Sequence, residues 1–342
     1  MAKQEHYLKN KEILRNIHLS KASFTWYIDG TWRNTKFLDY DFIACADDLY
    51  YQCREQLMLQ IVNNKRIKKN KRRTSVLKES DMDLLTSEDF EYIDNKIVIF
   101  NGKFDEKLLN HLKLGHYNRK LYENGNKRVN ELPKNVEIDE NDLVLRVFTY
   151  EHIPYTSEPR KNKKHMLVSD YKEKVNFPPY KHYAIVDGQV QCVALSHYNS
   201  NKEFDVKHGK INDGLGLAFM KLTERISKKH NWRDYSYIDE MITHALVQLS
   251  SVGLQFNELF SSNPFSYYTT VINNAFTVVF NSEKDNQQFR DELLMKNGHM
   301  PSSTKQYELE ESRSEYWDNK IGKKNMAPSE VVHIDPSNYN SE

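Results

Sequence analysis

Hydrophobic and polar positions follow a helical period between residues 235 and 290. In the first half of this segment, the apolar residues fall at offsets 0, 3, 4, 7, 8, 11 and 14, which is one stripe of an α-helix. Asp239 and Glu240 lie in its first turn, where the helix dipole favours negative charge, and Ser236 is the expected N-cap. The predicted stripe consists of Ile238, Met241, Ile242, Ala245, Leu246, Leu249 and Val252.

A second amphipathic helix is predicted to begin at Pro264 with Asn263 as its N-cap, because the first helical position needs no backbone N–H. Tyr267 lies off the apolar stripe of this helix. A further short helix, marked by Phe289 and Leu293, is expected to end at Gly298. The stripe of the second helix, which can pack on the first, consists of Phe265, Tyr268, Ile272, Phe276 and Val279.

A β-hairpin is predicted in the middle of the chain. Runs rich in apolar residues at 182–186 and 189–195 flank Asp187-Gly188, a pair that fits a two-residue type I′ turn. The run 143–150 can add a third strand. Because a lone hairpin is marginally stable, we expect a small antiparallel sheet.

Three other patterns predict local structure. Residues 92–93 and 96–100 flank Asp94-Asn95 and predict another tight hairpin. The apolar spacing after His208 predicts a helix with the stripe Leu215, Phe219, Leu222 and Ile226. Aromatic residues near the N-terminus are expected to pack in a core. They are Phe24, Trp26, Tyr27, Trp32, Phe37, Tyr40 and Phe42.

Together these elements predict an α+β protein in five parts. The parts are an N-terminal helical, aromatic-rich region (1–62), a charged linker (63–90), a β-containing insertion (91–205), a helical module (206–300) and a polar flexible tail (301–342). With 342 residues, of which 39% are hydrophobic, the chain can bury a substantial core. It has no apolar run of about 18 residues and no signal-peptide core, so we expect an intracellular protein without membrane partners.

The cysteine and charge patterns bear on whether the chain binds a metal or nucleic acid. Cys45, Cys53 and Cys192 lack the spacing of a zinc site and are expected to be reduced and buried. The net charge is only +1, but seven cations fall within residues 65–73, followed by a mostly acidic stretch at 79–94. This basic run fits phosphate binding and a solvated, extended linker equally well.

Four ordered motifs resemble region 2 of the sigma-70 family, in the form found in late-transcription sigma factors of tailed bacteriophages. A looser likeness, at residues 6–11, 20–21 and 176–179, extends the resemblance to most of the chain. The four motifs are Tyr237-Ile238-Asp239-Glu240-Met241, Asn263-Pro264-Phe265-Ser266-Tyr267-Tyr268-Thr269, Asn274-Ala275-Phe276 and Glu283-Lys284.

The resemblance implies a helical sigma region 2-like module that binds host RNA polymerase core and promoter DNA in the host cytoplasm, without catalysis, cofactor or metal. The polymerase contact would be the polar face of the first helix, Asp239, Glu240, His244 and Gln248, although such a face can equally be only solvated. The implied DNA-binding residues are Trp232, Tyr235, Tyr267, Asn273, Asn274, Thr277 and Lys284. Among the aromatics, periodicity favours a core role for Phe265 and Tyr268, and a base-stacking role for Tyr267.

Two departures from the family pattern bear on DNA recognition. Thr277-Val278-Val279-Phe280 stands where the family has basic residues. No helix-turn-helix resembling region 4 follows Gly298, so recognition of an upstream promoter box would require a phage co-activator. Apart from these departures, the resemblance implies that the protein recognises and melts a short AT-rich late promoter element.

Two other functions compete with a sigma factor. A virion structural or assembly protein would share the polar composition and the aromatic core, because a fold does not determine a function. A nuclease is suggested by the order of His182, Asn199 and His208, which loosely matches an HNH site but lacks the acidic or cysteine context of such a metal site. Co-purification with RNA polymerase core discriminates the sigma factor from both.

Residues 206–300 contain ten Lys or Arg and ten Asp or Glu, so this module is neutral. We predict that it has negligible affinity for duplex DNA without polymerase, because few counterions are released from DNA by a neutral surface. A mobility-shift titration at several salt concentrations should show weak retention with little salt dependence. Tight and specific duplex binding would contradict a polymerase-dependent mechanism.

Overall fold

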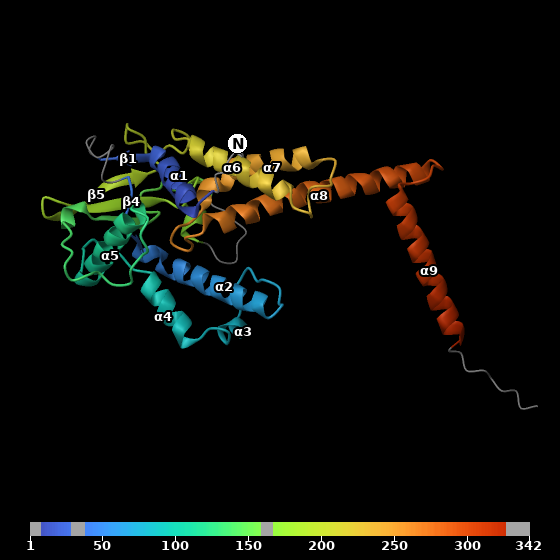
Figure 1. Cartoon of the computed structure of the whole chain (residues 1–342), viewed down its shortest axis with the longest axis horizontal. Coiled ribbons are helices and arrows are strands. Elements are labelled where there is room, and N and C mark those ends of the chain that lie inside the picture. The colour runs from blue at the N-terminus through green and yellow to red at the C-terminus, as the bar shows by residue number, and fades with distance from the viewer. Residues whose placement is uncertain (1–7, 29–37, 159–166, 326–342) are drawn as a thin grey trace, which may run out of the picture. The chain divides into compact units, whose positions relative to one another are not determined.

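A five-stranded sheet lies at the centre of the first of two structural units, residues 1–276 (Figure 1). The computed structural model describes residues 8–28, 38–158 and 167–325. The strand order is β1-β5-β4-β3-β2, and all neighbours are antiparallel except β2 and β3. The strands are β1 (Thr25–Tyr27), β2 (Phe42–Cys45), β3 (Val144–Phe148), β4 (Tyr180–Val186) and β5 (Gln189–Ser196).

The predicted central hairpin is confirmed. β4 and β5 pair around Asp187 and Gly188, whose φ angles of 51° and 75° are the positive values that a type I′ turn requires. β3 pairs with β4 as the expected third strand. The protein is therefore an α+β protein, as predicted.

The N-terminal region contributes more to the sheet than its sequence pattern indicated. The region contains two helices, α1 (Asn10–Ser23) and α2 (Tyr50–Lys68), but β1 and β2 lie between them at opposite edges of the sheet. The expectation of an entirely helical region is therefore wrong, because strands of three and four residues are too short to show a period. Phe24 and Tyr27 are buried as expected, whereas Trp32 and Phe37 lie outside the described residues.

The predicted hairpin at residues 92–100 is wrong. Helix α4 (Ser87–Lys96) covers its first half, because Thr86 caps the helix and Glu88 and Asp89 occupy the first turn. Ile97 has extended backbone angles, and residues 98–100 continue beyond the helix. They lie beside β2, where Cys45 N–H donates to the Val98 carbonyl (2.9 Å) and Phe100 N–H to the Cys45 carbonyl (3.0 Å).

Helices cover the sheet on both faces. On one face, α5 (Glu106–Glu123) packs Leu108 and Leu112 against Leu145 and Val147 of β3. On the other face lie the intervening β3 residues, including Arg146. Helix α3 (Glu79–Met82) follows α2, and short 3₁₀ turns occur at Asp47–Leu49, Glu140–Asp142, Val168–Asp170 and Gly253–Gln255.

The three predicted C-terminal helices of this unit are present as α6 (Asp213–Ser227), α7 (Ile238–Val252) and the first part of α8 (Pro264–Lys296). α1 packs on α6, and α6 packs on α7, as Figure 1 shows. Their apolar stripes supply a continuous core. Its buried members include Ile13, Ile17, Leu215, Phe219, Leu222, Met241, Ala245, Leu249, Tyr268, Ile272 and Phe276.

The second unit, residues 277–342, corrects two predictions. α8 runs without a break to Lys296, so the expected separate short helix is part of it, and the chain then turns at Gly298, where φ is 76°. Helix α9 (Ser303–Asn325) occupies much of the expected flexible tail, and residues 326–342 lie outside the described residues. Asp291 anchors the turn by accepting hydrogen bonds from the backbone N–H and the hydroxyl of Ser302 (2.7 Å each).

Gly115 allows α5 to approach the backbone of Asp41 closely. A Cβ at this position would lie 2.0 Å from the backbone oxygen of Asp41, which cannot move away as a side chain can. We predict that Gly115→Ala lowers the free energy of unfolding by about 1–3 kcal/mol. Gly216→Ala in α6 is the control, because nothing lies within 4 Å of its Cβ position, and it should stabilise by about 1 kcal/mol. Urea unfolding of both variants measures the difference; a neutral Gly115→Ala would contradict this packing.

Candidate functional site

The predicted polymerase-binding face lies on α7. Asp239 and Glu240 are exposed in the first turn, while His244 and Gln248 are half-buried. Glu240, His244 and Gln248 are four residues apart and so share one side of the helix, together with the 58% exposed Val247. The N-cap is Tyr237 and has no side-chain cap bond, so the expected capping by Ser236 is wrong. The face combines negative charge with one exposed apolar side chain.

The start of α8 matches its prediction closely. Asn263 accepts a hydrogen bond from the Ser266 backbone N–H (3.3 Å), and Pro264 is the first helical residue. Tyr268 is fully buried and donates its hydroxyl to the Gly253 carbonyl (2.9 Å), whereas Phe265 is only half-buried. Tyr268 is therefore the core residue that periodicity indicated, and Phe265 contributes less to the core than expected.

Tyr267 is neither a free surface ring nor a core residue. It is half-buried, its hydroxyl donates to the Val252 carbonyl (2.9 Å), and its ring centroid lies 5.8 Å from that of Phe256. Burial raises the pKa of its hydroxyl, so the ring stays neutral at physiological pH. The ring is thus held by contacts on one side while part of it remains accessible.

Trp232, Tyr235 and Asn273 come together beside the first part of α8. The Trp232 indole N–H donates to the Asn273 side chain (3.4 Å), and the Trp232 ring lies edge-on to Phe276 with centroids 5.5 Å apart. The Tyr235 ring is 6.4 Å from that of Trp232. Asn274 is exposed. Three of the predicted DNA-binding residues therefore form one aromatic and amide cluster, which is suited to stacking and hydrogen bonding.

Thr277 and Lys284 belong to the second unit, where both are exposed on α8. Lys284 is the only cation among the predicted DNA-binding residues. Of the basic run 65–73, Lys65 pairs with Asp89 and Arg66 with Asp81, so two of its seven charges are used within the fold. The remaining five are exposed, so phosphate binding by this run stays a prediction. The expectation of an extended linker is wrong, because Lys65, Arg66 and Lys68 lie in the last turn of α2 and the helices α3 and α4 follow.

A buried cluster of charged residues, which sequence reasoning missed, holds the connection between α7 and α8. Glu258, 3% exposed at its side chain, receives hydrogen bonds from Lys21 Nζ of α1 to both carboxylate oxygens (2.8 Å each). Lys21 also donates to the Phe256 carbonyl (2.8 Å). We call Lys21, Glu258 and Arg146 the ionic cluster. The signal that could have revealed it is a single arginine within the otherwise apolar run 143–148.

Arg146 of β3 is the third member of the ionic cluster. It is fully buried, with its guanidinium carbon 4.0 Å from the ring centroids of both Tyr40 and Tyr180. Its Nε donates to His182 Nε2 (2.9 Å), and its Nη1 lies 3.7 Å from Glu258 Oε1. Stacking between two aromatic faces suits the weakly hydrated, planar guanidinium better than it would an ammonium group.

Burial and charge act in opposition on this cluster. Burial lowers the pKa of Lys21 to about 8, although the Glu258 carboxylate acts to raise it. Burial acts to raise the pKa of Glu258, but the charges of Lys21 and Arg146 hold it below its ordinary value. Glu258 therefore remains ionised and paired at neutral pH.

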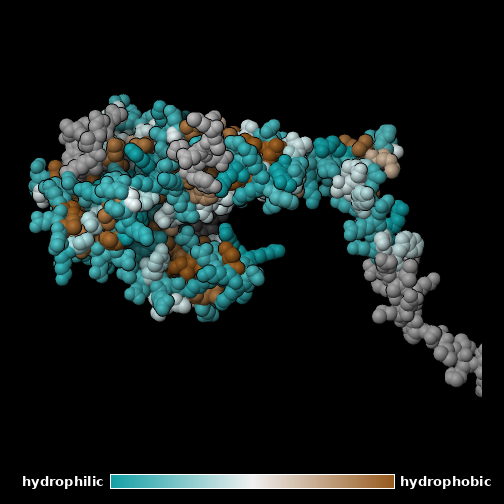
Figure 2. Space-filling view, viewed as in Figure 1, coloured by the Kyte–Doolittle hydropathy of each residue, from teal (hydrophilic) through white to brown (hydrophobic). Residues whose placement is uncertain are grey.

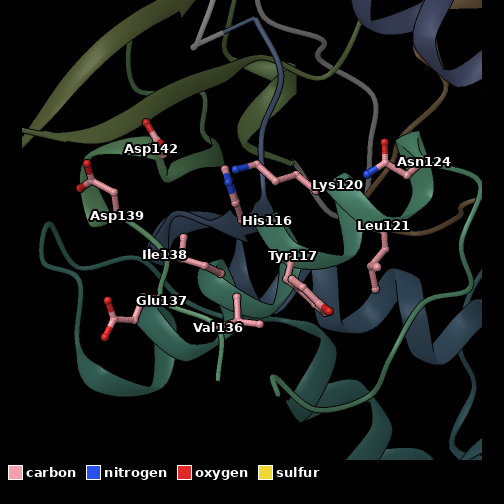
Figure 3. A pocket seen from close by; sticks show the side chains of 10 residues that line it. All are labelled: His116, Tyr117, Lys120, Leu121, Asn124, Val136, Glu137, Ile138, Asp139 and Asp142. Atoms are coloured by element: carbon pink, nitrogen blue, oxygen red, sulfur yellow. The ribbon is translucent and has the colours of Figure 1, made fainter. Parts of the chain in front are cut away.

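A pocket of about 350 Å³ lies between α5 and residues 136–142 (Figure 3). His116, at its wall, shares the Asp41 carboxylate with Arg119, at distances of 3.0 and 2.8 Å. None of the predicted polymerase- or DNA-binding residues lines this pocket. The surface seen in Figure 2 is largely hydrophilic, with separate hydrophobic patches.

The HNH-like residues are in dissimilar surroundings. His182 is fully buried against Arg146, whereas His208 is exposed and its Nδ1 faces the Asp205 carbonyl (2.8 Å). Within the described residues, no group of three or more His, Cys, Asp or Glu is placed to hold a metal ion. Cys45 and Cys53 are free and buried as expected, and Cys192 is free but half-buried.

In the described part of the chain, no helix combines the length and hydrophobicity that crossing a lipid bilayer requires. Comparison with models of protein families, with curated proteins and with solved structures finds no match to this chain.

We predict that Glu258→Gln lowers the free energy of unfolding by about 3–5 kcal/mol, because it leaves the charges of Lys21 and Arg146 buried without their partner. Glu224→Gln, which breaks an exposed pair with Lys228, is the control and should leave stability nearly unchanged. Denaturant unfolding measures both.

The pH dependence provides a second test of the same variant. Because the pKa of Glu258 is lowered on folding, its contribution to stability is present above the ordinary carboxyl pKa and is lost as the pH falls through the lowered value. The Glu258→Gln variant should lack this part of the acid dependence. Equal acid sensitivity of variant and wild type would rule out an ionised Glu258.

Proposed function

We propose that this protein is a phage-encoded, sigma-like transcription initiation factor. It binds host RNA polymerase core in the host cytoplasm and recognises and melts a short AT-rich late promoter element. The observation that supports this most is the α7–α8 pair, in which the four motifs resembling sigma region 2 lie on two consecutive helices. A polar helix face and an aromatic cluster are thereby presented by adjacent elements.

The polymerase contact assigned here is the α7 surface of Glu240, His244 and Gln248, which share one side of the helix, together with Asp239 in the first turn. Interfaces between proteins combine an apolar centre with a polar rim, and Val247 offers an exposed apolar side chain close to Glu240 and beside His244. Neither Asp239 nor Glu240 forms a salt bridge within the described residues. Their charges thus remain available to a basic partner surface.

The DNA contact assigned here is the aromatic and amide cluster with Tyr267. Base stacking on an aromatic ring contributes roughly 1–3 kcal/mol per base through the π face of the ring, separately from the cations that hold the DNA backbone. This suits a module with equal numbers of positive and negative residues. Polymerase would supply most of the affinity for the DNA backbone, and a phage co-activator would supply recognition of an upstream box.

Asp239→Lys combined with Glu240→Lys should abolish binding to polymerase core. Reversing two charges at a desolvated contact costs several kcal/mol of binding free energy, whereas on a solvated helix face it costs only tenths. The exposed acidic pair Glu310 and Glu311 of α9, reversed in the same way, is the matched control. Pull-down and titration against core polymerase measure the effect. A folded double variant that binds as well as wild type would refute the α7 assignment.

Tyr267→Ala should weaken open-complex formation by roughly 1–3 kcal/mol, the contribution of one stacking platform. Tyr267→Phe is the control, because it keeps the ring and loses only the hydrogen bond to Val252, at about 1 kcal/mol of folding stability. Permanganate footprinting of the promoter bubble, with thermal melts of each variant, separates stacking from folding. Equal bubble opening by both variants would move the base-capture role elsewhere.

A further inference from the structure

The sequence assigns no role to residues 1–205, yet Lys21 and Arg146 make buried contacts to the connection between α7 and α8. We propose that Lys21 is a positioning residue, which orients the Tyr267 ring for base capture by holding the backbone of Phe256. This inference rests on the proposed function. It gives residues 1–205 the role of a scaffold for the aromatic platform of α8.

Lys21 is itself held in place by contacts to the sheet. Lys21 is fully buried near the end of α1, and the backbone carbonyl of Lys21 accepts a hydrogen bond from the Thr25 hydroxyl of β1 (2.9 Å). The same hydroxyl lies 2.9 Å from the Tyr180 hydroxyl of β4. Residues of two strands thus hold the backbone of Lys21, from which its buried side chain extends.

The ammonium group of Lys21 in turn holds the connection between the two helices. Among the described residues, Lys21 Nζ donates three hydrogen bonds to the α7–α8 connection, one to the Phe256 carbonyl and two to the Glu258 carboxylate. An ammonium group has three donors, so this set uses its full capacity. Arg146 of β3 supports the same carboxylate, with its Nη1 3.7 Å from Glu258 Oε1.

The connection contacts Tyr267. The Phe256 side chain is 2% exposed, and its ring packs against the Tyr267 ring at a centroid distance of 5.8 Å. The Tyr267 hydroxyl donates a hydrogen bond to the carbonyl of Val252, the last residue of α7 before the same connection. The half-exposed Tyr267 ring therefore rests on a segment whose backbone Lys21 holds directly.

The test begins with a measurement that does not depend on polymerase. The protein is labelled with 3-fluorotyrosine, and the Tyr267 fluorine signal is identified by its absence from the Tyr267→Phe variant. Lys21→Met should shift or broaden the Tyr267 signal in the free protein. Leu112→Ala is the control, because it opens a cavity in the core on the opposite face of the sheet and destabilises the fold without touching the connection. An unchanged Tyr267 signal in Lys21→Met overturns the proposal.

The second measurement separates positioning from general destabilisation. Lys21→Met should bind polymerase core as wild type does, because the α7 face is unaltered. It should open the promoter bubble less, and the loss should approach the roughly 5- to 150-fold decrease that corresponds to one lost stacking platform. Leu112→Ala should open the bubble normally at a temperature where it remains folded. Wild-type bubble opening by Lys21→Met overturns the proposal.

A double-mutant cycle completes the test. If Lys21 acts through the Tyr267 ring, adding Lys21→Met to Tyr267→Ala should cause no further loss of bubble opening. Fully additive losses overturn the positioning role. If wild-type protein fails to bind polymerase core, the proposed function fails, while the fluorine measurement still decides whether Lys21 positions Tyr267.

Discussion

The buried carboxylate of Glu258 is the interaction on which the arrangement of the first unit depends. It lies where three parts of the chain meet, and it is satisfied by a lysine from α1 and approached by an arginine from β3. Removing such a carboxylate from water costs several kcal/mol unless charge and hydrogen bonds compensate it. The connection between α7 and α8 is therefore stable in this position only when the helix and the sheet are both in place.

An apolar contact at the same place would be less demanding of geometry. Hydrophobic burial is non-directional, so side chains can slide and repack with small cost. The ionic cluster instead requires matched donors and acceptors, and it places the Phe256 carbonyl within hydrogen-bond distance of Lys21. A precise position of the connection is useful if the next residues present an aromatic ring to a ligand, as the proposed function requires.

The proposed function also accounts for the modest charge of the helical module. A factor that acts only on the polymerase does not need a basic surface of its own, because the larger enzyme can hold the DNA backbone. The aromatic cluster of Trp232, Tyr235 and Asn273 and the half-buried Tyr267 would then contribute selectivity for unpaired bases more than affinity. In the proposed function, the exposed acidic residues at the start of α7 would contact the polymerase rather than DNA.

The sequence by itself determined the elements whose pattern is local and long enough to repeat. The apolar stripes of α6 and α7, the Asn263-Pro264 start of α8 and the Asp187-Gly188 turn were all predictable, because helix periods, caps and turn residues act within a few positions. The same local rules failed at residues 92–96, where a good helix cap outweighed strand-like composition.

Only the tertiary structure decided which distant residues meet. The short strands β1 and β2 gain their hydrogen bonds from β5 and β3, far along the chain, and no period marks them. Lys21 and Glu258 are separated by 237 positions, and in the sequence each is an ordinary surface-type residue. Pairing of buried charges is a property of the folded core, since it depends on desolvation that the sequence pattern does not reveal.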